Sequence, residues 1–177
     1  MSASDTNDLT MRSQLGKEGR KLFRKLMAVE FPLHQEDKSQ IVPPGWCTWT
    51  QAHPAKLSLH ITLVIHPTRD AFIAEVGWSK TGKLTSSSSR YTKKGMMEEP
   101  NFVRLPELWG FNGMEPWWNL VLRPEEYERA ILYEDDPVEQ CIPLVAPAVW
   151  DLGEKLKEHA VPVFEEIVRK HGSESAK

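Results

Sequence analysis

The stretch LSLHITLVI, residues 57–65, decides the fold, because a leucine or isoleucine stands at every second position. Successive side chains of a strand point to opposite faces of a sheet, so this period of two predicts a half-buried strand. The turn-forming residues PTRD follow at 67–70, and the segment AFIAEVGW, residues 71–78, predicts a second strand. Together the two segments predict a β-hairpin.

The register of this hairpin follows from the loop between its strands. If His66 faces Ala71, every core-facing residue of the first strand meets an apolar residue of the second. A shift by one residue would turn the whole apolar set to the other face, so the sequence strongly specifies the register. The predicted pairs are Ile65 with Phe72, Leu63 with Ala74, Ile61 with Val76 and Leu59 with Trp78.

Helices are predicted before and after the hairpin. Apolar residues recur at helical spacing over residues 13–30, which indicates an amphipathic helix. Pro124 suits the first turn of a short helix that runs to Tyr133. The C-terminal segment also has helical spacing, and Pro162 predicts a break or kink in it. The expected apolar anchors are Leu15, Leu22, Leu26 and Val29 in the first helix, and Trp150, Leu152, Leu156, Val163, Phe164 and Ile167 near the C-terminus.

The fold class that follows is α+β. We expect an antiparallel sheet around the 57–65/71–78 hairpin, packed by the N-terminal amphipathic helix and by the C-terminal helices. Further strands are predicted at 46–51 and 117–122. A chain of 177 residues has the size of one domain. We expect that domain to span 13–171, with disordered tails at 1–12 and 172–177.

Composition narrows the class of protein. The net charge is −3, so no overall field favours nucleic acid or an acidic membrane. Cys47 and Cys141 are too few for a disulfide framework or a four-cysteine zinc site. The polar first residues lack the apolar centre of a signal peptide, and no apolar run approaches the roughly 18 residues of a membrane span. We therefore expect a cytoplasmic protein with reduced thiols, no membrane association, and no metal or cofactor.

One polar pair on the hairpin is a candidate for chemistry. The register places His60 diagonal to Glu75, with Thr62 directly opposite that glutamate. A carboxylate beside an imidazole could orient a general base or begin a metal site. The structural interpretation is a polar pair on a solvated sheet face. Neither an H-E-x-x-H motif nor a G-x-S-x-G motif supports an enzyme, so this small enzyme or metal protein remains an alternative.

Two basic segments suggest a second alternative, a nucleic-acid-binding accessory protein. Residues 17–25 place five Lys and Arg side chains on one face of the first helix, and the loop 80–94 carries further cations and no acid. Such a surface contacts phosphates or an acidic partner, unless it is simply a solvated face. The residues predicted to make these contacts are Lys17, Lys21, Arg24, Lys93 and Lys94.

Aromatic residues form the third candidate site. Trp117 and Trp118 are adjacent, so in a strand their rings point to opposite faces and both cannot fill one core. Trp109 and Phe111 lie just upstream, in a stretch rich in glycine and proline that suits a rigid loop. Aromatic anchors dominate the energetics of protein interfaces. We expect at least one of these four side chains to be exposed and to bind a partner.

The order of elements resembles that of small, uncharacterised bacterial α+β domains, some of them associated with toxin-immunity or defence loci. The resemblance is carried by the strands LHITLVIH (59–66) and AFIAEVGW (71–78), and by the terminal helix ending VPVFEEIVRKHG (161–172). It implies an immunity-like or accessory protein and offers no catalytic residues. Because no acid, base and nucleophile converge in the sequence, we expect a non-enzymatic protein-interaction module.

Overall fold

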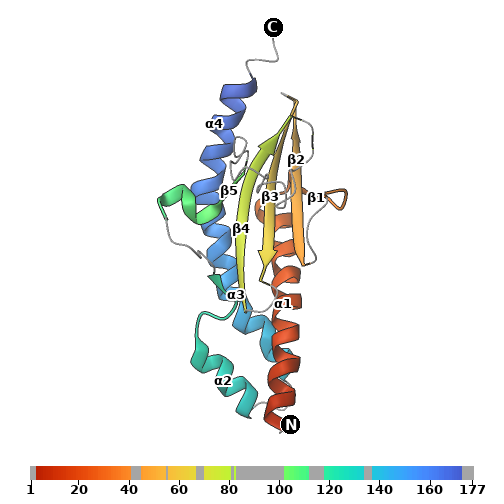
Figure 1. Cartoon of the computed structure of the whole chain (residues 1–177), viewed down its shortest axis with the longest axis vertical. Coiled ribbons are helices and arrows are strands. Elements are labelled where there is room, and N and C mark those ends of the chain that lie inside the picture. Colours follow the sequence, from red (N-terminus) through yellow and green to blue (C-terminus); the bar gives the residue numbers. More distant parts are fainter. Residues whose placement is uncertain are drawn as a thin grey trace, which may run out of the picture.

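The computed structural model describes residues 3–40, 45–54, 56–66, 70–80, 82, 102–111, 118–133 and 137–172. The fold is α+β, as predicted, with an antiparallel sheet and helices from both ends of the chain (Figure 1). Apolar residues of the sheet and the helices form one shared core. The molecule is elongated, with the described start of the chain near one end and the C-terminal helix at the other (Figure 1).

The sheet has the order β1-β2-β3-β4-β5, with the short β6 beside β4. Every predicted pair of the hairpin is present, from Leu59 opposite Trp78 to Ile65 opposite Phe72. The register is therefore confirmed, since any slip would have exposed the apolar face. The strands are β1 (Gln35–Glu36), β2 (Trp46–His53), β3 (Leu57–Ile65), β4 (Ala71–Ser79), β5 (Phe102–Arg104) and β6 (Trp118–Asn119).

The helices are α1 (Ala3–Glu30), η1 (Leu105–Trp109), α2 (Pro124–Tyr133), α3 (Pro137–Lys155), η2 (Leu156–Ala160) and α4 (Val161–Gly172). The bounds predicted for α2 are confirmed. The break predicted near Pro162 is also present, as the π-helical turn η2 between α3 and α4. None of the helices in the described ranges is long and apolar enough to cross a membrane.

Two glycines allow α1 and α3 to pack closely beneath the sheet. A Cβ atom on Gly153 of α3 would lie 2.5 Å from Cδ1 of Leu26, which is itself buried in the core. A Cβ atom on Gly19 of α1 would lie 3.0 Å from Leu120 and 3.4 Å from Val145. Close helix approach thus depends on the absence of a side chain at these two positions.

Three sequence expectations need correction. Helix α1 begins at Ala3, so residues 3–12 of the expected disordered tail are helical; no glycine or proline interrupts the chain there. Val29 and Trp150, expected as core anchors, are 70% and 47% exposed. The buried stripe of α1 is centred on Gly19, Phe23 and Leu26, and at 100° per residue Val29 falls at its edge. Residues 1–2 and 173–177 of the expected tails lie outside the described residues.

Helix α3 contains two prolines that the sequence pattern did not mark as interruptions. Pro143 and Pro147 both stand on its exposed side. Each proline removes one backbone donor and leaves a carbonyl one turn earlier without its helical partner. On the solvent side water can satisfy these carbonyls, which is why the helix continues to Lys155.

Candidate functional site

The aromatic loop is held by a short 3-10 helix with a left-handed cap. Helix η1 ends at Trp109, and Gly110 follows with φ of 84°, a conformation that favours glycine. The backbone N–H of Gly110 donates to Glu107 O at 3.1 Å, and that of Phe111 donates to Pro106 O at 3.2 Å. These bonds fix the backbone that presents Trp109 and Phe111.

Trp109 is exposed and yet packed on several sides. Its ring meets Trp118 edge to face, with centroids 6.0 Å apart and planes at 75°. The His159 ring lies 4.6 Å away on another side, and Nζ of Lys155 lies 5.9 Å from the Trp109 centroid. These contacts come from β6, η2 and α3, so tertiary packing restricts the rotamers of an exposed tryptophan.

Trp118 connects this surface to the core. Its ring stacks on the buried Phe72 of β4, with centroids 6.1 Å apart and planes at 15°. Its indole Nε1–H donates to Asp151 Oδ2 of α3 at 3.0 Å. We define the aromatic surface as Trp109 and Phe111 together with Trp118, Lys155 and His159, which lie against the Trp109 ring.

The outcome for the four predicted aromatic residues is mixed. Trp109 and Phe111 are each 39% exposed, so the expectation of at least one exposed side chain is confirmed. Trp118 is half-buried and serves as a support, whereas Trp117 lies outside the described residues. Lys155 and His159 were not predicted, because they are distant in sequence and only the packing of η1 against η2 brings them to Trp109.

His60 lies in a chain of hydrogen bonds across three strands, on the face of the sheet opposite the helices. Oγ1 of Thr50 lies 3.1 Å from Asp37 Oδ2, and 3.0 Å from His60 Nδ1. His60 Nε2 lies 2.9 Å from Oγ of Ser79. His60 is completely buried and Ser79 nearly so.

The protons of this chain can be assigned from Asp37. Burial raises the pKa of its carboxyl, but hydrogen bonds from Ser39, Gln40 and Thr50 outweigh that effect and lower the pKa to about 2. An ionised carboxylate only accepts, so the Thr50 hydroxyl donates to Asp37. The Thr50 oxygen then accepts from His60 Nδ1–H, and His60 Nε2 accepts from the Ser79 hydroxyl. Burial lowers the His60 pKa to about 4, which keeps the ring neutral.

This arrangement corrects the structural interpretation of the His60 and Glu75 pair. Glu75 lies diagonal to His60, as predicted, but both residues are buried and the sheet face is not solvated. Both ring nitrogens of His60 are occupied by hydroxyl groups, so neither is available to a metal without breaking a bond. Within the described ranges, no group of three or more His, Cys, Asp or Glu side chains could hold a metal ion.

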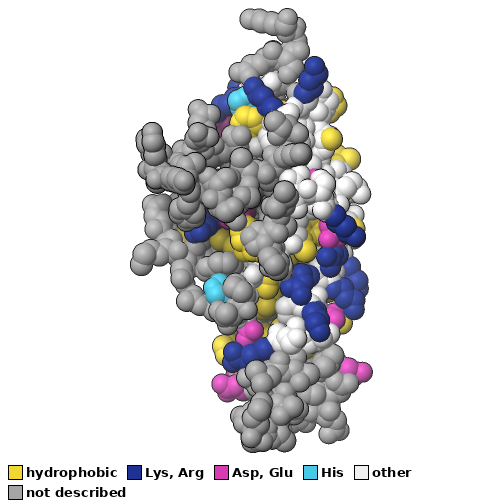
Figure 2. Space-filling view, turned by 45° about the vertical axis from the view of Figure 1, so that its right-hand side comes forward, with side chains coloured by type: hydrophobic (Ala, Val, Ile, Leu, Met, Phe, Trp, Pro, Cys, Tyr) yellow, Lys and Arg dark blue, Asp and Glu magenta, His cyan; other side chains and the backbone are white. Residues whose placement is uncertain are grey.

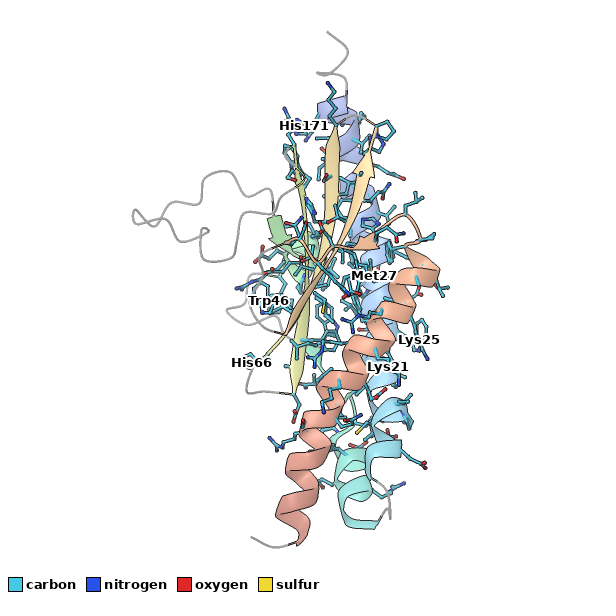
Figure 3. All side chains as sticks on the ribbon, turned by 90° about the vertical axis from the view of Figure 1, so that its right-hand side faces the viewer. Lys21, Lys25, Met27, Trp46, His66 and His171 are labelled. Atoms are coloured by element: carbon cyan, nitrogen blue, oxygen red, sulfur yellow. The ribbon has the colours of Figure 1, made fainter. Side chains whose placement is uncertain are left out.

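The basic face of α1 is prominent on the surface. Figure 2 shows Lys and Arg side chains gathered on one edge of the molecule, and Figure 3 shows Lys21 and Lys25 on the side of α1 away from the sheet. Arg24 is held by two-pronged hydrogen bonds to Glu36, at 2.9 to 3.1 Å, which raise the Arg24 pKa. Nζ of Lys21 lies 3.4 Å from Glu18 Oε2.

These ion pairs reduce the cations that the basic face offers to a phosphate. Of the predicted contacts, Arg24 and Lys21 already have acidic partners, and Lys17 has no ion-pair partner in the described part of the chain. Lys93 and Lys94 lie outside the described residues. Two of the five cations of this face are therefore paired with carboxylates, which lowers the charge that it offers to a phosphate.

The chain matches no protein-family model, no curated protein and no solved structure.

Proposed function

We propose that the protein is a non-enzymatic interaction module that binds another protein through its aromatic surface. The observation that carries this proposal is the exposure of Trp109 on a support of Trp118 and His159. An exposed tryptophan whose rotamer is already restricted loses little conformational entropy when it is covered by a partner. Tryptophan is also among the residues most enriched at interface hot spots.

Phe111 and the charged residues around Trp109 extend the proposed contact. Phe111 follows the left-handed Gly110 and exposes a second large apolar ring. Lys155 is paired with Glu158 at 2.8 Å, and its Nζ lies over the Trp109 ring. An apolar centre with paired charges at its rim is the usual composition of a protein interface. The resemblance to immunity-like bacterial domains supports an accessory or immunity-like role in a defence system, with a protein as the partner.

The two alternative functions, a small enzyme or metal protein and a nucleic-acid-binding protein, require different features of the structure. An enzyme or metal protein at His60 would need a free ring nitrogen, and both are hydrogen bonded. A nucleic-acid-binding protein would use the basic face, and its affinity would fall steeply with salt because phosphate contacts release counterions. Charge reversal at Lys17 should then weaken DNA retention, whereas Trp109→Ala should not.

A crosslinking experiment tests the proposed interface. A photoreactive phenylalanine analogue is placed at position 111, and at position 29 as a matched control on an exposed site of α1. We expect position 111 to capture one protein that position 29 does not. With that partner purified, Trp109→Ala should weaken binding by roughly thirtyfold, which corresponds to the loss of about 2 kcal/mol at a hot spot.

Stability measurements separate loss of binding from loss of folding. Phe111→Ala should weaken binding while the melting temperature stays within about 2 °C, as expected for an exposed side chain. Val29→Ala should change neither quantity. Equal capture at positions 111 and 29, or unchanged affinity in both aromatic variants, would show that the aromatic surface is not the interface.

A further inference from the structure

A groove separate from the aromatic surface lies between α4, the turn that follows α1, and one end of β2 and β3. Its volume is about 410 Å³. Small-molecule sites commonly have volumes of about 300–1,000 Å³ with mostly apolar walls. The walls here include the buried side chains of Phe31, Leu59 and Phe164. The size and lining are those of a site for one small organic molecule.

One polar group in the wall lacks a partner. His34 is 7% exposed and lines the groove, with its ring 5.7 Å from that of Phe164 and 6.0 Å from that of Phe31. Its Nε2 atom is buried and has no hydrogen-bond partner in the described structure. Buried polar atoms are nearly always paired, and an unpaired one destabilises the fold. Because this atom is closed to solvent, the ring of His34 contributes its contacts with Phe31 and Phe164 to the wall, and no open hydrogen-bonding position.

The charge of the groove restricts the ligand further. Glu30 and Glu165 line it, and no lysine or arginine does. Glu30 is paired with Lys157, whose Nζ lies 3.2 Å from Glu30 Oε2 and also 2.7 Å from Oε1 of Glu154. Glu165 is exposed and has no ion-pair partner within the described ranges. The groove thus has a net negative charge beside an apolar wall, with Glu165 unpaired, which favours a cation and disfavours an anion.

The mouth of the groove carries an exposed apolar residue. Leu33 is 70% exposed and belongs to the lining, in the turn between α1 and β1. A single exposed leucine is ordinary, but this one continues the apolar wall to the surface. A ligand with an apolar body would cover it.

We propose that this groove binds a small organic amine with an aromatic or branched aliphatic body. The body packs against Phe31, Phe164 and Leu33, and the ammonium group pairs with Glu165. This site is independent of the aromatic surface and adds a ligand-binding function to the interaction module.

Three probes of the same shape and different charge test the proposal: 1-naphthylmethylamine, 1-naphthalenemethanol and 1-naphthoic acid. Binding to the full chain is measured by calorimetry and by ligand-observed NMR at millimolar concentration. We expect the amine to bind about fivefold more tightly than the alcohol, since one exposed ion pair contributes about this factor, and the acid to bind most weakly. Glu165→Gln should remove the preference for the amine.

Two further variants complete the test. Glu165→Lys changes an exposed residue, so the chain should fold, and it should reverse the preference in favour of the acid. Val168→Trp fills the groove and should weaken all three probes at least tenfold. Glu166→Gln is the control, because Glu166 pairs with Lys170 and does not line the groove. Binding of none of the probes, or an order of affinities that Glu165→Lys leaves unchanged, would overturn the proposal.

Discussion

The two faces of the central sheet are both buried, but they are built from different chemistry. On the helix side, Ile61 and Leu63 of β3 pack with the apolar residues of α1 and α3. On the opposite side, His60 and Thr62 of the same strand are buried among hydroxyl groups of neighbouring strands. Alternation of apolar and polar residues therefore identifies the two faces of a strand, but it does not show that the polar face meets solvent.

The two faces also contribute different properties. Apolar packing is nondirectional and supplies most of the free energy of folding. The hydrogen bonds of the polar face each join two strands: Thr48 to Thr62 at 3.0 Å, Thr50 to His60, and His60 to Ser79. A register slip would break all of them together and leave buried polar groups unpaired. We infer that the helix face stabilises the sheet and that the polar face specifies its register.

The largest effect should come from the helix face. Ile61→Ala removes a completely buried side chain from the core and should lower the free energy of unfolding by about 2–5 kcal/mol. Urea denaturation measures this change. Val29→Ala removes an exposed side chain and should change the same quantity by less than about 0.5 kcal/mol. Similar effects of the two variants would mean that Ile61 is not in the core.

Two buried histidines, His60 on the polar face and His34 beside the groove, should make the stability of the protein depend on pH. Burial lowers the pKa of His60 and of His34 to about 4, below the ordinary value of 6.5. The unfolded chain takes up these protons near pH 6.5 and the folded chain does not, so the stability present above pH 6.5 is lost as the pH falls toward 4. Between pH 7 and 5 the free energy of unfolding should fall by about 2 kcal/mol for each histidine.

Denaturant unfolding at a series of pH values, with His34→Leu as the comparison, measures this loss. The variant keeps one of the two buried histidines, His60. The loss of unfolding free energy between pH 7 and 5 should therefore fall to about half. A flat profile between pH 7 and 5 would show that neither ring is held neutral by burial.

Two glycine substitutions test how tightly the helix side is packed. Gly153→Ala places a Cβ atom 2.5 Å from Leu26 and should destabilise the fold by about 1–3 kcal/mol through overpacking. Gly16→Ala places its Cβ atom at an ordinary 3.8 Å from Arg20 and Ile65, and should stabilise α1 by up to about 1 kcal/mol. Thermal unfolding of both variants shows whether each substitution stabilises or destabilises the fold. Stabilisation by both would indicate a looser interface between α1 and α3.

The smallest effect should come from the pair Thr48 and Thr62. Thr62→Val removes one hydroxyl and leaves that of Thr48 without its cross-strand partner, at an expected loss of about 1 kcal/mol. The double variant Thr48→Val/Thr62→Val leaves no orphaned hydroxyl and should recover most of that loss. A double-mutant cycle of unfolding free energies measures the coupling. Strict additivity would mean that this hydrogen bond does not hold β2 to β3.

Much of the fold was predictable because its signals are local. The period of two in β3, the turn after it and the apolar residues of β4 were sufficient for the register of every pair. Pro124 marked the first residue of α2, and Pro162 marked the break before α4. In contrast, β1 and β5 have two and three residues, too few to show a period in the sequence.

The site was predictable only in part. The exposed aromatics of the loop, Trp109 and Phe111, were identified by their setting among glycine and proline residues. Two supports of Trp109 were not identified, since Lys155 and His159 stand more than forty residues later in the chain. Trp150 was expected in the core and is exposed, because the side of α3 that faces α1 is decided by the packing of two helices.

The sequence by itself determined the hairpin, its register and the positions of the main helices, because strand period, helix period and proline act over a few residues. Only the tertiary structure decided that the polar face of the sheet is buried, and that His60 uses both ring nitrogens within it. Only the tertiary structure left His34 Nε2 unpaired, beside a groove between α4, the turn that follows α1 and one end of β2 and β3. Burial and hydrogen bonding depend on which distant segments pack together, and the periodicity of one segment does not show which segments those are.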